Sequence, residues 1–166
     1  METAGMTDAQ IEAFEMAQAK RLPRDEKVVN ALADVIRQTA YDIHVYLGVG
    51  YVEKVYENAL KHRLEKLGHD VLQQVKMVVR DEDGYNLGLY EADLVVDRKI
   101  ICELKAVKAL NGAHEAQLIN YLKATGIRDG MLINFGSAKF QAIKRVYDKM
   151  KMAPTFVFDD TPVARN

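Results

Sequence analysis

The stretch that most constrains the fold runs from Asp93 to Lys105 and reads DLVVDRKIICELK. Two short apolar runs, rich in β-branched residues, flank the polar triplet Asp97-Arg98-Lys99, a pattern typical of a β-hairpin. If the triplet is the loop, Val96 pairs with Ile100. The triplet lacks the glycine that three-residue loops often contain, and a two-residue loop would place the flanking acids on opposite faces, so this register is a hypothesis.

A three-residue loop gives the hairpin one charged and one apolar face, because side chains alternate along a strand. The charged face carries Asp93, Glu103 and Lys105. The apolar face carries Leu94, Val96, Ile100, Cys102 and Leu104. Opposed carboxylates repel unless a cation lies between them, and Mg²⁺ prefers such oxygen ligands. A nearby lysine can orient water or stabilise negative charge. The alternative is an exposed ladder of salt bridges.

A second carboxylate-bearing segment is the predicted helix from Tyr51 to Leu67, ended by Gly68. Its apolar arc consists of Val52, Val55, Tyr56, Ala59, Leu60, Leu64 and Leu67. At ~100° per residue, Glu53 falls inside this arc and Glu57 at its margin. A carboxylate that faces the core needs a cation or hydrogen-bond donors. Glu53 is either paired with an arginine such as Arg63 or, as we favour, a third metal ligand facing the hairpin.

A polar stripe lies on the helix predicted from Asn111 or Gly112 to Thr125, which Gly126 closes. His114, Gln117 and Tyr121 are spaced i, i+3 and i+7, so they share one face. Such a stripe either contacts a nucleic-acid phosphate or base, or packs as a half-buried polar row against the sheet. The spacing leaves both interpretations open.

The remaining pattern predicts an α/β fold, with a central mixed sheet of four or five strands flanked by helices on both sides. A further helix runs from its N-cap Asp25 to Leu47. The predicted strands are Val71–Arg80, Tyr85–Val96, Lys99–Lys105, Met131–Phe135 and Lys139–Tyr147. The run Met131–Phe135 is apolar throughout, which is typical of a buried parallel strand.

Length and charge bound the function. A chain of 166 residues with 49% hydrophobic and 28% charged residues fits one domain. We expect an N-terminal extension over residues 1–24, the domain over 25–151 and a tail over 152–166. The net charge of −1 excludes a global basic field, so nucleic-acid binding would need metal or a local patch, such as the lysine-rich stretch 139–151. The single cysteine, Cys102, excludes an intrachain disulfide and a cysteine-based zinc cluster.

Targeting signals are not evident. The N-terminus is polar and acidic, unlike a signal peptide, and no apolar run approaches the length of a membrane span. We therefore expect a cytoplasmic protein that does not bind membranes.

One motif gives a specific resemblance. Spaced residues from Ala40 to Leu60, among them Gly50, Glu53 and Tyr56, resemble the signature of the GxxExxY protein family, which belongs to the PD-(D/E)XK nuclease superfamily. Asp93, Glu103 and Lys105 fit the nuclease core of that superfamily. Gln117 and Tyr121 resemble the QxxxY motif of its exonuclease-type members.

The resemblance implies a PD-(D/E)XK restriction-endonuclease-like core and a metal-dependent nuclease, with DNA favoured over RNA as substrate. Mg²⁺ or Mn²⁺ would be held by Glu53, Asp93, Glu103 and the Leu104 carbonyl. Asp93, Glu103 and Lys105 would be catalytic, with Lys105 assisting the attacking water. His114, Gln117 and Tyr121 would contact the substrate. A non-catalytic nucleic-acid-binding or oligomeric scaffold, and a regulator that binds protein or nucleotide, stay open as alternatives, as does homo-oligomerisation.

Overall fold

The computed structural model describes residues 24–147. Its elements are α2 (Glu26–Leu47), α3 (Glu53–Lys66), β1 (Val71–Arg80), β2 (Asn86–Val96), β3 (Ile100–Lys105), α4 (Gly112–Thr125), β4 (Asp129–Asn134) and β5 (Gln141–Val146). Every helix and strand expected between residues 25 and 147 is present, with ends that differ by two residues or fewer. The predicted extension 1–24, apart from Arg24, and the tail 152–166 lie outside the described residues.

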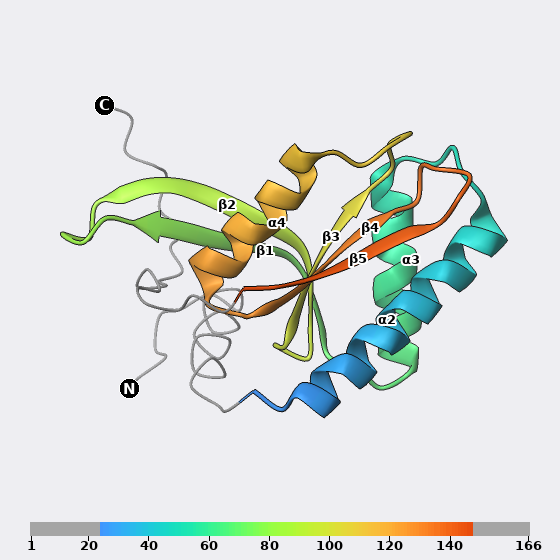
Figure 1. Cartoon of the computed structure of the whole chain (residues 1–166), viewed down its shortest axis with the longest axis horizontal. Helices are drawn as coiled ribbons and strands as arrows, with labels where there is room; N and C mark the ends of the chain where they lie inside the picture. Colours follow the sequence, from blue (N-terminus) through green and yellow to red (C-terminus); the bar gives the residue numbers. More distant parts are fainter. Residues whose placement is uncertain (1–23, 148–166) are drawn as a thin grey trace.

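The strands form one five-stranded sheet in the order β1-β2-β3-β4-β5. The β3–β4 pair is parallel, whereas the other three pairs are antiparallel, so the predicted mixed sheet is confirmed. Helices α2 and α3 pack on one face of the sheet and α4 on the other, as the two buried apolar clusters and Figure 1 show. The α/β fold with helices on both sides is therefore confirmed.

The hairpin register is the predicted one. Val96 pairs with Ile100 and Leu94 with Cys102, so Asp97, Arg98 and Lys99 form the loop. The five residues of the predicted apolar face all belong to the core beneath α2 and α3. Asp93 and Glu103 therefore do not belong to this apolar face. They lie just beyond the Leu94–Cys102 pair, where the pairing of the hairpin ends.

The loop manages without glycine, although Asp97 and Arg98 have φ values of 50° and 54°. Left-handed backbone is tolerated better by Asp than by most residues. The Asp97 carboxylate accepts a hydrogen bond from the Asp70 backbone N–H at 2.8 Å and contacts the His69 ring at 2.8 Å. Arg98 pairs with the Asp70 carboxylate at 2.5 Å. These contacts stabilise a loop conformation that the sequence alone does not favour.

Helices α2 and α4 begin and end where their capping residues predict. The Asp25 side chain accepts hydrogen bonds from Lys27 and Val28 at the start of α2. Asn111 caps α4 in a capping box with His114, and Gly126 ends α4 in the left-handed conformation. Local sequence therefore determines the bounds of these two helices.

Helix α3 is oriented differently from the expected arc. Val52, Val55 and Leu67, three members of that arc, are 71%, 36% and 61% exposed. The buried side chains are Tyr56, Glu57, Leu60 and Leu64. The helix is thus rotated so that Glu57, expected at the margin, is buried, while Glu53 is only half-buried. The ring of Tyr56 stacks on Phe135 at 4.7 Å between centroids, which accounts for this orientation.

Strands β1 and β2 form a long ribbon that extends well beyond the rest of the sheet (Figure 1). Strand β2 pairs with β3 only from Leu94 to Val96, whereas it pairs with β1 along most of its length. The two strands therefore diverge just beyond Leu94. Asp93 lies at this point of divergence.

Two expectations about surfaces can be compared with the structure. Within residues 24–147, no helix is long and apolar enough to cross a membrane. In the lysine-rich stretch, Lys144 contacts Asn30 and the buried Asp129, and Arg145 pairs with Glu115 at 2.8 Å. These two side chains are engaged in ion pairs, so they do not form an open basic track. Lys149 and Lys151 lie outside the described residues.

Candidate metal centre

Asp93 occupies a break in the sheet. In a continuous ladder the Leu104 N–H would bond to the backbone of β2; here it donates to Asp93 Oδ2 at 2.8 Å. The carboxylate thus satisfies a backbone donor that the divergence of β2 leaves free. Because the N–H and C=O of one strand residue point to the same side, the Leu104 carbonyl also faces the space beside Asp93. That orientation is the one its proposed role as a ligand requires.

Glu103 lies on the adjacent strand and is 2% exposed. Its Oε1 accepts from Lys105 Nζ at 3.3 Å. Its Oε2 is buried and has no hydrogen-bond partner among residues 24–147. A buried carboxylate oxygen without a donor is costly. Something positive or a donor is therefore expected at this oxygen.

Burial and the neighbouring charges also shift the pKa of Glu103. Burial and next the Asp93 carboxylate raise the pKa of Glu103 to about 8, against the lowering effect of Lys105. Burial, with smaller contributions from the carboxylates of Glu57 and Glu53, raises the pKa of Asp93 to about 6, against the lowering effect of the hydrogen bond from Leu104. The two groups are electrostatic neighbours that favour a shared cation.

Glu53 approaches this pair from the first turn of α3. Partial burial raises the pKa of Glu53, with Lys105 and His114 lowering it and Glu57 raising it. Its electrostatic partners are thus residues of the hairpin and of α4. Arg63, the alternative partner, lies over the ring of Tyr46 at 5.6 Å. Arg63 is therefore not the partner of Glu53 in the structure.

The stripe on α4 faces the carboxylates. Gln117 Nε2 donates to the Tyr121 hydroxyl at 2.9 Å. Burial, followed by the Glu103 and Asp93 carboxylates, raises the pKa of Tyr121 to about 12. The Asn111 N–H donates to His114 Nδ1 at 3.2 Å, so a neutral imidazole carries its proton on Nε2. His114 and Gln117 are half-buried and Tyr121 is buried, so the stripe packs against the sheet close to the acids; its contact with a nucleic acid stays a prediction.

The residue that sequence reasoning missed is Glu57. Its carboxylate is almost fully buried, and its Oε1 accepts from Lys54 Nζ at 2.9 Å and from the side-chain amides of Gln73 and Gln74, each at 2.7 Å. The available signal was its four-residue spacing from Glu53, which puts both acids on one side of α3.

The donor set fits a hard divalent cation. The oxygens available are those of the Asp93 and Glu103 carboxylates and the Leu104 carbonyl, and Glu103 Oε2 has no partner within the described residues. Within residues 24–147, no three His, Cys, Asp or Glu side chains already converge into a closed metal cluster. Mg²⁺ does not need one, because it is usually held by one or two carboxylates with water and substrate phosphate completing its shell. Glu53 lies nearby as a third carboxylate.

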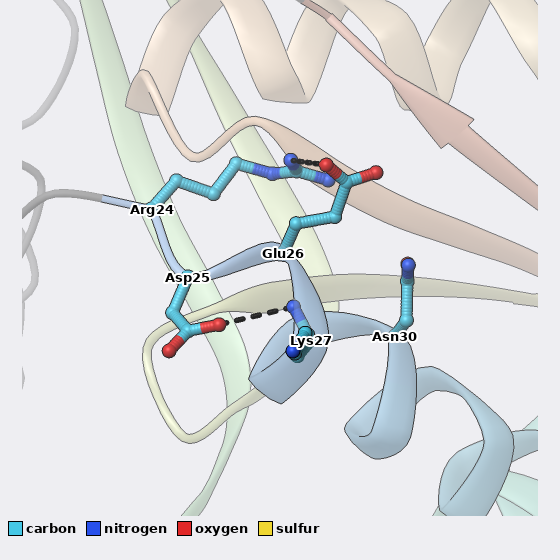
Figure 2. Close-up of a pocket in the computed structure, with 5 residues that line it drawn as sticks. All are labelled: Arg24, Asp25, Glu26, Lys27 and Asn30. Carbon is cyan, nitrogen blue, oxygen red and sulfur yellow. Dashed lines mark hydrogen bonds and ion pairs between the residues drawn. The ribbon is translucent and has the colours of Figure 1, made fainter.

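A separate hollow lies at the N-terminal end of α2. Arg24, Asp25, Glu26, Lys27 and Asn30 line it (Figure 2). It is at the opposite end of the sheet from the carboxylates, because Arg24 pairs with Asp129 at the start of β4. Both oxygens of Asp129 accept from the guanidinium, at 2.8 and 3.0 Å. The polar groups that line this hollow are thus engaged in holding α2 against the sheet.

The fold and the site together define a class: an α/β domain in which paired carboxylates and a lysine on a β-hairpin face a polar helix. Residues 30–146 match the family model described as the PD-(D/E)XK nuclease superfamily, and the chain belongs to that superfamily. Its members are typically nucleases, and they generally use divalent metal ions such as Mg²⁺ or Mn²⁺.

Other comparisons add little. No curated protein matches the chain at significant similarity. One similar solved structure is described as the crystal structure of SSO0001, with a TM-score of 0.44 and 14% sequence identity over 87% of this chain and 80% of that chain. A likeness this weak is not evidence for the fold or for the activity.

Proposed function

We propose that the protein is a metal-dependent nuclease that hydrolyses phosphodiester bonds, with DNA as its substrate. The observation that carries this proposal is the buried Glu103 Oε2, which lacks a partner in the described part of the chain and lies beside a second, repelling carboxylate and a lysine. Membership of the nuclease superfamily supports the same chemistry. The narrower assignment to the GxxExxY family rests on Gly50, Glu53 and Tyr56 and is also part of the proposal.

Asp93, Glu103 and the Leu104 carbonyl would bind Mg²⁺ or Mn²⁺, with Glu53 as a further ligand. When bound, the ion supplies positive charge that polarises the phosphodiester and lowers the pKa of a water molecule. The Lys105 ammonium group lies 3.3 Å from Glu103 Oε1. From there it would orient the attacking water or neutralise charge that develops on the phosphate.

Residues of α4 would orient the substrate. The Gln117 amide and the Tyr121 hydroxyl are already hydrogen-bonded to one another, so they present a fixed pair of polar groups. Such groups position a phosphate without reading sequence. The His114 Nε2–H is a further donor on the same side of α4.

The test separates binding from cleavage. Calorimetry with Mn²⁺ and with Mg²⁺ should detect a site that Glu103→Gln weakens by 10-fold or more. Cleavage of single- and double-stranded DNA and RNA should require the same ions. Wild-type protein that binds the metal and nucleic acid but cuts none of these substrates would support the scaffold alternative. Wild-type protein that binds neither ion would overturn the metal centre itself.

A further inference from the structure

The feature left over by the proposed function is the cluster around Glu57. A single oxygen, Oε1, accepts three hydrogen bonds, from Lys54, Gln73 and Gln74. The Glu57 carboxylate is buried between α3 and β1. None of its three hydrogen-bond donors is a proposed metal ligand. A buried carboxylate with several hydrogen-bond donors stabilises the local structure of the elements that carry those donors.

Gln74 has an unusual backbone. Its φ is 54°, although it lies inside β1. A left-handed φ is uncommon for a residue with a side chain and is not expected in a strand. Its Nε2 donates to Glu57 Oε1 at 2.7 Å. The side chain is therefore fastened to α3 at the position where the backbone departs from the strand conformation.

Gln74 lies opposite Asp93. The register pairs Gln73 with Leu94 and Val75 with Ala92, and the ladder skips the pair between them. Asp93 is thus released from β1 at the same position where β2 leaves β3. Its carboxylate turns to the Leu104 N–H instead. The backbone irregularity at Gln74 and the side-chain bond of Asp93 thus fall at one position of the β1–β2 pair.

We infer that Glu57 and Gln74 form a positioning device: the Glu57 carboxylate holds Gln74 in the left-handed conformation, and that conformation sets Asp93 for metal binding. Neither residue is one of the proposed metal ligands. The inference rests on the proposed metal centre. It assigns a role to a carboxylate and a backbone irregularity that the nuclease chemistry does not otherwise use.

The experiment compares substitutions at one position by Mn²⁺ calorimetry, well below the melting temperature of each variant. Gln74→Ala removes the tether but keeps a Cβ, so the strand relaxes and Mn²⁺ affinity falls about 10-fold, as for other groups that orient a ligand. Gln74→Gly also removes the tether, but glycine adopts φ > 0 at no steric cost. Its affinity should stay within about 3-fold of wild type.

Three further variants complete the design. Gln73→Ala is the matched control, because it also removes a donor to Glu57 Oε1 but leaves a residue that pairs normally with Leu94; its affinity should be unchanged. Glu57→Ala should reproduce the loss seen in Gln74→Ala, and adding Gln74→Gly to it should restore most of the affinity. A purely structural role would not produce this rescue by glycine.

The outcomes are distinct. Gln74→Ala with wild-type affinity, or Gln74→Gly as weak as Gln74→Ala, overturns the positioning role and leaves the metal centre standing. A Glu57→Ala protein that does not fold leaves the Gln74 series and its Gln73 control to decide. Wild-type protein that binds no Mn²⁺ overturns the metal centre and, with it, the positioning role.

Discussion

The substitution Glu103→Gln should stabilise the metal-free protein at alkaline pH. The pKa of Glu103 is raised from 4.5 to about 8, chiefly by burial and next by the Asp93 carboxylate. In the unfolded chain the same carboxyl ionises near its ordinary pKa. Between these two values the folded state binds more protons than the unfolded state, so stability falls as pH rises. Glutamine keeps the shape of the side chain and removes the ionisation.

The magnitude follows from the two pKa values. A rise from 4.5 to about 8 corresponds to roughly 5 kcal/mol at ~1.4 kcal/mol per pKa unit. At pH 5 the unfolded carboxyl is already mostly ionised, and at pH 8 the folded carboxyl is only half ionised. The loss between pH 5 and pH 8 is therefore roughly 3 kcal/mol. For a chain of this size, that is a fall in Tm of roughly 6–12 °C.

The assay is thermal unfolding in EDTA from pH 5 to pH 8, followed by circular dichroism. Wild-type Tm should fall across this range, and Glu103→Gln should lose most of the fall. Glu91→Gln is the matched control, because Glu91 is an exposed carboxylate on β2, two residues from Asp93; it should keep the wild-type slope. A wild-type Tm that is flat or rises towards pH 8 would refute the reasoning, as would a Glu103→Gln slope equal to that of wild type.

Three further outcomes are expected. Glu53→Gln should weaken Mn²⁺ binding measured by calorimetry while Tm is retained; a lower Tm with normal binding would indicate a structural ion pair instead. Lys105→Ala should bind Mn²⁺ at least as tightly as wild type but cleave DNA about 10²–10⁴-fold more slowly, and equal cleavage would contradict a role in the reaction. Tyr56→Phe keeps the ring stack but loses hydrogen bonds to Gly48 O at 2.6 Å and from Tyr51 N at 3.2 Å. The free energy of unfolding measured in urea should therefore drop by about 1–2 kcal/mol. An unchanged value would show that this hydroxyl does not hold the loop before α3.

Metal should also be bound more tightly as pH rises. Binding requires ionised carboxylates, and the pKa values of Asp93 and Glu103 are raised to about 6 and about 8. Mn²⁺ affinity measured by calorimetry should therefore increase from pH 5.5 to pH 8.5. Affinity that is constant over this range would show that these two groups are not the ligands.

The sequence by itself determined the local features. Alternation around Asp97–Lys99 predicted the register of the hairpin and its apolar face, because a one-residue slip would have moved Leu94 to the face that carries the acids. Asp25, Asn111 and Gly126 predicted helix ends, because capping is a contact between near neighbours in the chain. The α/β class followed from the order of these elements.

Only the tertiary structure decided the details of the candidate site. The rotation of α3 that buries Glu57 and leaves Glu53 half-exposed depends on the stack of Tyr56 against Phe135, a contact between residues far apart in the chain. The left-handed backbone of Gln74 coincides with a hydrogen bond from its side chain to Glu57 on another element. Neither leaves a periodic mark in the sequence, because periodicity reports which face is apolar and not which donor a buried carboxylate finds.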